Sequence, residues 1–437
     1  MLLESVAAKH EIAKEKLNGF SYKERRKEVW NLDMLSEEEI DAVLRAQEST
    51  SSVKMGGMKL RVDTNQVSSN EPNEDYIIWR PIKPNTEGGT SQYMFGVFDG
   101  HNGSHRCAEQ VAARIGPMLD NSLEIINQMS KSATVNKTTF DKHSLPATLS
   151  RLKQEECAGW GNIPLALTAA FLSLDRELVY DALSKYCRLQ DVTKMDELLR
   201  PALDGSCGLV AVVDAEANEI VVANIGDSRA LLGTRLNNGT WKAVPLSEDQ
   251  TGTNKKEVIL LNSEHPNEPS LIVNGRVLGG PMITRAFGDC MYKWPLEVQK
   301  DMFPSMYLRG YKYAKTPPNY LTPPYITANP EIVRHKLDEN DKFIVVASDG
   351  LYDQLSDAEV VNTVARWYEA NQKRSETLMT QDMNVATHLI RLALSIDESN
   401  QYSDTAIGKL LAIPSPHSRR FRDDISAMVI LLDRDQQ

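Results

Sequence analysis

The sequence has few cysteines and no long apolar run. Its five cysteines are odd in number, and no two of them are spaced as a Cys-x-x-Cys pair. This excludes a disulfide scaffold and a thiolate zinc site, and it is typical of a protein in a reducing compartment. A membrane-spanning helix needs ~18–20 consecutive apolar residues. No run approaches that length, so we expect no transmembrane segment.

The chain also has fewer basic than acidic residues. Against 60 Asp and Glu the chain of 437 residues has 49 Lys and Arg, which gives a formal net charge of −11. Nucleic acids and anionic membranes are bound by clustered Lys and Arg, so we expect no nucleic-acid partner. The acid excess leaves open whether the carboxylates form a solvated surface or whether some of them gather at a site.

The N-terminus has no legible targeting segment. Residues 1–20 lack the apolar core of a secretory signal, and a mitochondrial presequence is rich in Arg and poor in acids. The first 30 residues contain five Glu and only two Arg. From these residues alone no compartment can be assigned.

Helix and strand signals alternate along the chain. Ser36 with Glu39 forms a capping box at a helix start, and Ser356 with Glu359 forms a second one. The runs YMFGVF, GLVAVVD, EIVVAN, KFIVVAS and ISAMVILL are typical of strands that are covered on both faces. The AEAN link between the second and third runs favours an antiparallel hairpin. The alternation by itself also fits a parallel, doubly wound sheet.

No composition shift marks a strong domain boundary. We expect an N-terminal helical extension over residues 1–50 and one large domain over residues 51–437. Three polar or proline-rich stretches, near residues 128–160, 295–330 and 374–419, are interpreted as insertions in that domain.

Acidic residues recur where the expected strands begin or end. The pattern consists of Glu74, Asp75, Asp99, Gly100, Asp349, Asp423 and Asp424. Carboxylate oxygens are ligands that Mg²⁺ and Mn²⁺ prefer, and a glycine offers an unshielded backbone carbonyl. Any one of these pairs is more often a simple turn or a solvated loop end. Their recurrence is what predicts a metal–carboxylate site.

Seven strings taken together resemble a known family. They are NEDY, FGVFDGHNG, GSCGLVAVV, ANIGDSRALL, TRAFGD, ASDGLYD and RDDISAMV. In this order they are similar to the motifs of the type 2C, metal-dependent (PPM) protein serine/threonine phosphatases. The resemblance implies an enzyme of the α+β class, a four-layer α-β-β-α sandwich with two mainly antiparallel sheets flanked by helices.

Other strings resemble one subgroup of that family, the pyruvate dehydrogenase phosphatases. They are LSEEEIDAVLRAQE, ALTAAFLSLDRELV, LNSEHPNE, RAFGDCMYKW and PPNYLTPPYITANPEI. This likeness implies a phosphoprotein substrate, with the pyruvate dehydrogenase complex as the candidate, and the mitochondrial matrix as the compartment. The N-terminal residues do not resemble a mitochondrial presequence. This favours the alternative, an active phosphatase of the same family with a cytoplasmic signalling substrate. The oligomeric state stays open.

The resemblance also implies two Mg²⁺ or Mn²⁺ ions and a metal-activated water that hydrolyses phosphoserine or phosphothreonine. Asp99 matches the aspartate that bridges both ions, and Gly100 matches the residue that lends its carbonyl. Asp349 and Asp423 match ligands of one ion, and Asp75 matches the acid near the other ion.

Two further residues have roles by resemblance. Glu74 matches an acid that reaches the metal through water. His101 matches the general acid that protonates the departing seryl oxygen, and an imidazole suits that step because it titrates near neutral pH. A histidine that merely caps its turn is the alternative interpretation for His101. Asp227, Arg229, Arg285 and Asp289 are expected to tie turns together through charge-assisted hydrogen bonds.

The sequence departs from the family pattern at three positions. Asn70 stands where several members have a phosphate-binding arginine, and Ala202 stands where an aspartate could hold a third metal. Gln250 replaces a histidine. A catalytically inactive module of the same fold is a further alternative. Inactive relatives typically lose one or more metal aspartates, whereas this chain retains all four, Asp75, Asp99, Asp349 and Asp423.

Overall fold

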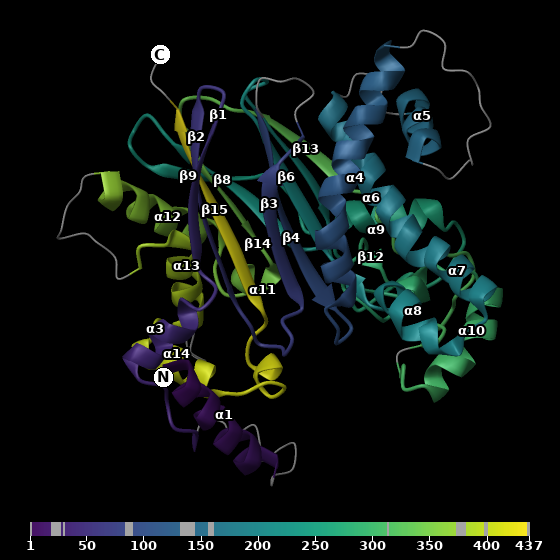
Figure 1. Cartoon of the computed structure of the whole chain (residues 1–437), viewed down its shortest axis with the longest axis horizontal. Coiled ribbons are helices and arrows are strands. Elements are labelled where there is room, and N and C mark those ends of the chain that lie inside the picture. Colours follow the sequence, from purple (N-terminus) through teal and green to yellow (C-terminus); the bar gives the residue numbers. More distant parts are fainter. Residues whose placement is uncertain are drawn as a thin grey trace. The chain divides into compact units, whose positions relative to one another are not determined.

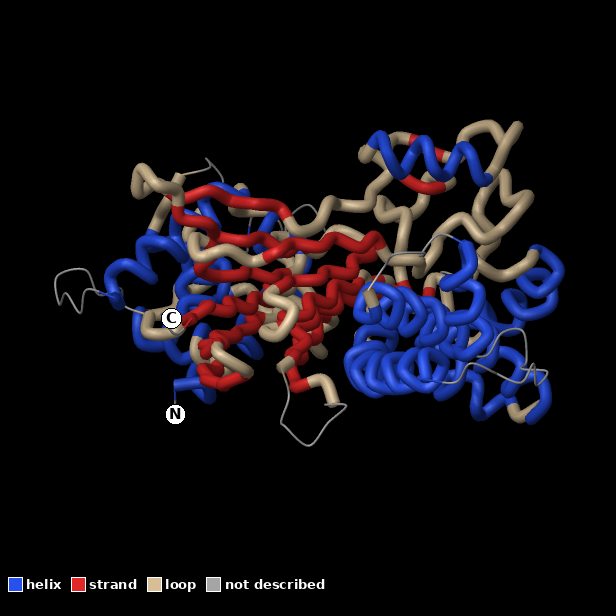
Figure 2. The backbone as a smooth tube through the Cα atoms, turned by 90° about the horizontal axis from the view of Figure 1, so that it is seen from above, coloured by secondary structure: helices blue, strands red, loops and turns tan. Residues whose placement is uncertain are grey.

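The computed structural model describes residues 2–18, 28, 31–83, 91–131, 145–155, 161–312, 314–372, 382–396 and 401–434. The chain divides into two compact units. The first consists of Met1–Asp75, Ala230–Pro245 and Asp338–Gln437, and the second of Tyr76–Arg229 and Leu246–Leu337. Each unit has its own sheet (red strands in Figure 2) and its own helices (blue).

The sheet of the first unit has the strand order β1-β2-β15-β14-β8-β9. Its strands are β1 (Ser49–Met55), β2 (Met58–Val67), β8 (Arg229–Arg235), β9 (Trp241–Pro245), β14 (Asp341–Ala347) and β15 (Ile425–Arg434). The pairs β1–β2, β2–β15, β14–β15 and β8–β9 are antiparallel. The central strand β15 therefore joins the last residues of the chain to β2 near its beginning.

Helices α12 and α13 lie beside this sheet, as Figure 1 shows. The helices of the unit are α1 (Leu2–Asn18), α3 (Glu37–Leu44), α11 (Asp349–Tyr352), α12 (Asp357–Gln372), α13 (Val385–Leu394) and α14 (Asp404–Ala412). Apolar residues of α12, α13, β14 and β15 form one buried cluster that includes Trp367 and Phe343. Burial of that apolar surface provides the main stabilisation of the unit.

The sheet of the second unit has the order β12-β5-β4-β6-β7-β13, with β3 also paired to β4. Its strands are β3 (Asp75–Pro81), β4 (Gln92–His101), β5 (Gly205–Ser206), β6 (Gly208–Asp214), β7 (Glu219–Ile225), β12 (Phe287–Gly288) and β13 (Glu331–Lys336). A separate two-stranded ribbon joins β10 (Ile272–Val273) to β11 (Arg276–Val277). Every residue of β6 and of β7 is buried.

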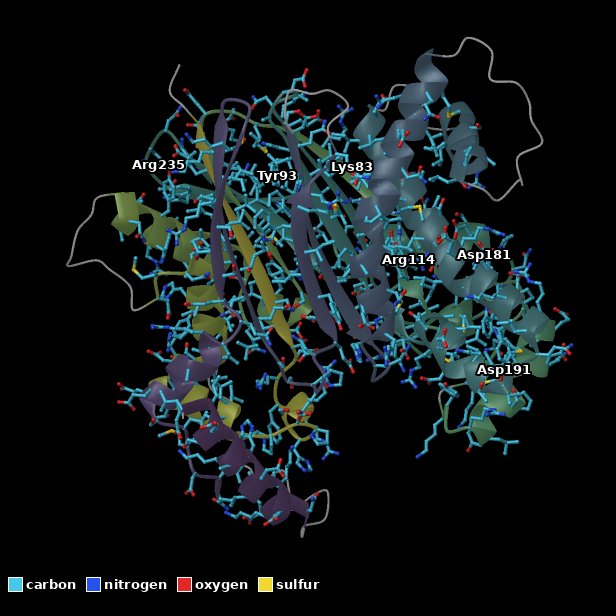
Figure 3. All side chains as sticks on the ribbon, in the orientation of Figure 1. Lys83, Tyr93, Arg114, Asp181, Asp191 and Arg235 are labelled. Carbon is cyan, nitrogen blue, oxygen red and sulfur yellow. The ribbon has the colours of Figure 1, made fainter. Side chains whose placement is uncertain are left out.

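Helices α4 and α6 pack beside one another in the second unit (Figure 1). Its helices are α4 (Arg106–Lys131), α5 (Leu145–Glu155), α6 (Asn162–Arg176), α7 (Ala182–Leu189), α8 (Met195–Leu203), α9 (Lys255–Glu264) and α10 (Leu296–Leu308). Residues Glu177–Asp181 form a π-helical turn between α6 and α7. Arg114 of α4, labelled in Figure 3, forms an ion pair with Glu177 in that turn.

The structure confirms the predicted α+β fold with two mainly antiparallel sheets and flanking helices. The β6–β7 hairpin is antiparallel as expected, so the alternative of a parallel, doubly wound sheet is wrong. Both predicted capping boxes are present, at Ser36 and at Ser356. Within the described part of the chain, no helix combines the length and apolarity needed to span a membrane.

The end of strand β4 differs from the sequence-based expectation. Asp99 was expected to follow its strand, but β4 continues through Asp99 and Gly100 to His101. The strand is longer because Gly100 and His101 pair with Ser206 and Gly205 of β5. A domain boundary near residue 50 and the three insertions remain predictions, and parts of the stretches 128–160 and 374–419 lie outside the described residues.

Candidate functional site

The first unit brings Asp75 into an environment that opposes its negative charge. Asp75 begins β3, is 4% exposed, and has a buried Oδ2 atom with no hydrogen-bond partner among the described residues. Burial, and next the charge of Asp424, raise the pKa of Asp75 to about 7, although the hydroxyls of Ser348 and Ser426 act in the opposite direction. A buried carboxylate without a cation is costly, so this position favours a bound positive charge.

Asp424 organises the loop that precedes Asp75. Its Oδ1 accepts hydrogen bonds from the backbone N–H groups of Ser69 (2.5 Å) and Asn70 (2.9 Å). Its Oδ2 accepts from the Asn70 side chain and from the backbone N–H of Glu74, each at 2.9 Å. The structure therefore gives Asn70 a role that sequence reasoning did not find, since its amide holds Asp424 in place.

Asp349 and Asp423 come from two neighbouring loops of the same unit. Asp349 opens the short helix α11 two residues after β14 ends, and Asp423 lies two residues before β15 begins. These loops approach closely, because a Cβ atom placed on Gly350 would lie 2.1 Å from the backbone oxygen of Asp424. Burial raises the pKa of Asp423, which also pairs with Arg419. The first unit thus gathers Asp75, Asp349 and Asp423 in one loop cluster.

The second unit has its own acidic group at the end of β4. A carboxylate oxygen of Asp99 lies within 4.8 Å of one of Asp227. Asp227 is partly buried, its Oδ1 accepts a hydrogen bond from the Cys207 thiol at 3.2 Å, and burial raises the pKa of Asp227. Two carboxylates this close repel each other unless a cation or a proton lies between them. Asp227 was expected only to tie a turn, so its position beside Asp99 is a finding of the structure.

His101 has a buried carboxylate partner. Its Nε2 atom lies 2.8 Å from Oδ2 of Asp289, and the Asn102 side chain donates to Oδ1 of the same carboxylate at 2.9 Å. Burial opposes ionisation of Asp289, but the charge and hydrogen bond of His101 outweigh it and lower the pKa. A Cβ atom on Gly205 would lie 1.9 Å from His101 Nε2. Only glycine at position 205 leaves room for the imidazole.

The expected charge-assisted hydrogen bonds are confirmed for the two arginines, and each arginine pairs with an acid that lies outside its own motif. Arg229 binds Asp249 through Nε (2.6 Å) and Nη2 (2.7 Å). Arg285 binds Glu257 through Nε (2.9 Å) and Nη2 (2.7 Å). Bidentate pairs of this kind fix geometry as well as charge.

Gln250, which had no explanation in the sequence, supports the turn that contains Asp227. Its Oε1 accepts from the backbone N–H of Gly226 at 3.0 Å, and its Nε2 donates to the carbonyl of Asn224 at 3.1 Å. The side chain is fully buried. Gln250 therefore positions Asp227 indirectly, through the backbone on its N-terminal side.

The donor chemistry of both groups fits a hard divalent cation. The candidate ligands are carboxylates and one backbone carbonyl, all of them oxygen donors of the kind that Mg²⁺ and Mn²⁺ prefer. The orphaned Oδ2 of Asp75 supplies a lone pair that a metal would use. The residues present therefore fit such an ion.

Comparisons with known proteins agree with this chemistry. A family model described as Protein phosphatase 2C matches residues 162–401. The chain is 34% identical over 451 residues to pyruvate dehydrogenase phosphatase 1, mitochondrial, of Saccharomyces cerevisiae, covering 91% of this chain and 73% of that protein. It is 32% identical over 454 residues to the human mitochondrial pyruvate dehydrogenase phosphatase 2, covering 91% and 83%.

A solved structure supports the fold. The serine-threonine phosphatase 2C of Toxoplasma gondii superimposes with a TM-score of 0.50 at 19% sequence identity, covering 88% of this chain and 99% of that chain. At this identity the likeness concerns the fold alone.

Proposed function

The chain belongs to the protein phosphatase 2C family and is a protein serine/threonine phosphatase, and from that premise we propose that it uses two Mg²⁺ or Mn²⁺ ions to dephosphorylate the pyruvate dehydrogenase complex. The observation that carries the metal part is Asp75, a buried carboxylate with an unsatisfied oxygen and a raised pKa. A bound cation would offset this charge and satisfy this oxygen.

We assign the metal ligands from the family resemblance. Asp99 would bridge the two ions, Gly100 would lend its carbonyl, Asp349 and Asp423 would bind one ion, and Asp75 would bind the other. Glu74 would act through a water molecule. Bound metal would lower the pKa of a water and neutralise phosphoryl charge. The chain's own contribution is to hold these oxygens in place, which Asp424 does for the loop before Asp75.

His101 would donate the proton that the departing serine oxygen needs. Asp289 holds the ring through Nε2, and as an ionised carboxylate it stabilises the protonated imidazole. Asn102 in turn holds Asp289. We therefore propose Asp289 as a positioning residue for the general acid.

The proposed substrate rests on the relatives. Two mitochondrial pyruvate dehydrogenase phosphatases align with 91% of this chain at 34% and 32% identity. The mitochondrial matrix is proposed as the compartment on the same ground. A cytoplasmic phosphoprotein would be the substrate if the experiment below shows no preference.

The test is phosphate release from phosphorylated pyruvate dehydrogenase complex and from phosphocasein, each with Mn²⁺, Mg²⁺ or EDTA. We expect metal-dependent release with a preference for the dehydrogenase, and loss of release in Asp99→Asn. Asp181→Asn is the matched control, because Asp181 is an exposed aspartate of the second unit, labelled in Figure 3. Full activity in EDTA would contradict the metal mechanism, whereas equal rates on both proteins would contradict only the substrate.

A further inference from the structure

A buried ion pair in the second unit joins two of the strings that the sequence analysis singled out. ALTAAFLSLDRELV contains Asp175 of α6, and RAFGDCMYKW contains Lys293. Lys293 Nζ donates to Oδ1 of Asp175 at 2.7 Å, and the two side chains are only 2% and 11% exposed. A buried ion pair is often no more stabilising than apolar side chains of the same volume. The stability of the fold alone therefore does not account for this pair.

Both members of the pair also bind the backbone of β12, the strand that ends directly before Asp289. Oδ1 of Asp175 accepts a hydrogen bond from the backbone N–H of Gly288 at 2.9 Å. Lys293 Nζ donates to the carbonyl oxygen of Ala286 at 2.8 Å. Ala286 directly precedes β12, and Gly288 is its last residue. The ion pair thus fixes β12 at both ends.

The backbone of Asp289 depends on this support because it is in a left-handed conformation. Its φ and ψ are 48° and 44°, a region that residues other than glycine seldom occupy. The backbone N–H of Asp289 donates to the carbonyl oxygen of Asp204 at 2.9 Å. A Cβ atom on Gly288 would lie 2.1 Å from that same oxygen. In this conformation Oδ2 of Asp289 lies 2.8 Å from His101 Nε2.

Lys293 also provides positive charge near Asp289. Burial raises the pKa of Asp289, but the charges of His101 and Lys293 and the hydrogen bonds from His101 and Asn102 outweigh it and lower the pKa. Lys293 therefore stabilises two buried carboxylates, Asp175 by direct contact and Asp289 at longer range.

We propose that Asp175 and Lys293 are positioning residues for proton donation by His101, an inference that rests on the proposed role of His101 as general acid. The ion pair fixes β12, β12 fixes the backbone of Asp289, and Asp289 holds the imidazole ring. Loss of the pair should therefore slow the step in which the serine oxygen receives its proton. Loss of a purely structural contact would slow the reaction of every substrate alike.

The test compares kcat for a phosphoserine peptide with kcat for 4-nitrophenyl phosphate, using the whole protein with Mn²⁺. Nitrophenolate leaves without a proton, so the ratio of the two values reports on proton donation and does not depend on the folded fraction. The variant is Asp175→Asn/Lys293→Met, which removes both charges together and leaves neither ion buried without its partner. Since a displacement of ~1 Å can cost on the order of 10²-fold in rate, we expect the ratio to fall about 10-fold, with KM for the peptide unchanged.

The matched control is a second ion pair of the same unit that also binds a backbone N–H group. Arg80 Nη2 donates to Oδ2 of Asp120 at 2.6 Å, and Oδ1 of Asp120 accepts from the backbone N–H of Lys83, labelled in Figure 3, at 3.0 Å. Among the described residues, neither side chain forms a hydrogen bond to the segment 286–289. Arg80→Met/Asp120→Asn should therefore leave the ratio unchanged.

An unchanged ratio in Asp175→Asn/Lys293→Met, or an equal fall in the control variant, would overturn the inference. Asp175→Asn alone keeps an acceptor for the Gly288 N–H and should give a smaller fall in the ratio. It serves as the test if the double variant does not fold, and an unchanged ratio there would likewise contradict the inference.

His101→Gln separates this inference from the proposed function. A ratio that falls in His101→Gln but not in Asp175→Asn/Lys293→Met would show that only the role of the ion pair is wrong. A ratio that His101→Gln leaves unchanged would show that His101 is not the general acid, and the inference would fail with that assignment.

Discussion

Asp75 and Asp382 are both buried aspartates of the first unit, yet their pKa values shift in opposite directions. Asp382 is 1% exposed and is held by Arg391 at 2.7 Å from Oδ2 and 2.8 Å from Oδ1. Burial raises the pKa of Asp382, but His388 and Arg391 outweigh it and lower the value to about 2. For Asp75, burial and the neighbouring acid dominate and raise the pKa to about 7.

The two pKa shifts differ because, among the described residues, one carboxylate has a positively charged side chain beside it and the other does not. Asp382 receives its positive charge from the chain, so its carboxylate is part of a finished structural contact. Asp75 has acidic neighbours, Asp423 and Asp424, and an oxygen without a hydrogen-bond partner among the described residues. A buried charge is stable only with a partner. The surroundings therefore distinguish Asp382, whose charge the chain itself compensates, from Asp75, whose charge it does not.

The largest expected effect is the loss of the structural contact. Asp382→Asn leaves the partly buried Arg391 guanidinium with Asp41, 2.7 Å away, as its one acidic partner among the described residues. Breaking a buried ion pair costs ~3–5 kcal/mol, and the remaining Asp41 contact places the expected loss near the lower end. Urea unfolding measures this, while phosphatase activity per folded molecule should stay unchanged. A loss of less than ~1 kcal/mol would mean that the pair behaves as a surface contact.

Asp75→Asn should instead lower phosphatase activity while it leaves the stability of the metal-free protein intact. Activity should fall on the order of 10²–10³-fold, as when a preorganised electrostatic group is removed from a reaction centre. The metal-free variant should be at least as stable as wild type, because a repelled charge has been removed. Initial rates on a phosphoserine peptide and thermal unfolding in EDTA measure the two parts. A destabilised Asp75→Asn in EDTA would show that Asp75 is structural after all.

Asp289→Asn should have a smaller effect that depends on the leaving group. General acid catalysis supplies ~10²–10⁴-fold, and loss of the His101 orientation should remove about 10-fold to 100-fold of it from kcat on a phosphoserine peptide. Hydrolysis of 4-nitrophenyl phosphate should change much less, since nitrophenolate leaves without a proton. Equal losses on both substrates would indicate a general structural role. Asn102→Ala should give a weaker form of the same pattern.

The smallest expected effect is on the pH dependence of stability. The pKa of Asp75 is raised from 3.8 to about 7, so metal-free folded protein binds more protons than the unfolded chain between these values, and its stability should fall as pH rises through that window. For Asp382, lowered to about 2, the contribution is present above pH 3.8 and is lost as pH falls towards 2. Urea titrations in EDTA, compared among wild type, Asp75→Asn and Asp382→Asn, measure both slopes. A wild-type slope that Asp75→Asn leaves unchanged would contradict the assignment.

Local features of the fold could be predicted from the sequence. The capping boxes, the β6–β7 hairpin and the acids beside strands depend on residues within a few positions of one another, and each has a direct physical reason. The contacts that complete the site could not. Asp289 is 188 positions from His101, and Asp424 is 350 positions from Glu74. Pairings of this kind depend on how the sheets bring distant loops together, which no local pattern encodes.

Because such distant contacts are not visible in a local pattern, the sequence alone could not predict what Asn70 and Gln250 do. Each is defined by a backbone or side-chain partner on another segment, Asp424 for Asn70 and Gly226 for Gln250. The ion pair of Asp175 and Lys293 likewise joins residues that are 118 positions apart. Sequence patterns therefore predict the candidate catalytic and metal-binding residues. The residues that position these candidates are found only from the tertiary contacts.

The most direct test of the central claim is the thermal unfolding midpoint of the protein as Mn²⁺ is added after removal of metal with EDTA. A ligand at ~100 times its dissociation constant adds ~2.7 kcal/mol to stability. We predict a saturable rise for wild type and for Asp382→Asn, and a much weaker rise for Asp75→Asn. A wild-type midpoint that does not change with Mn²⁺ would contradict a metal centre at Asp75.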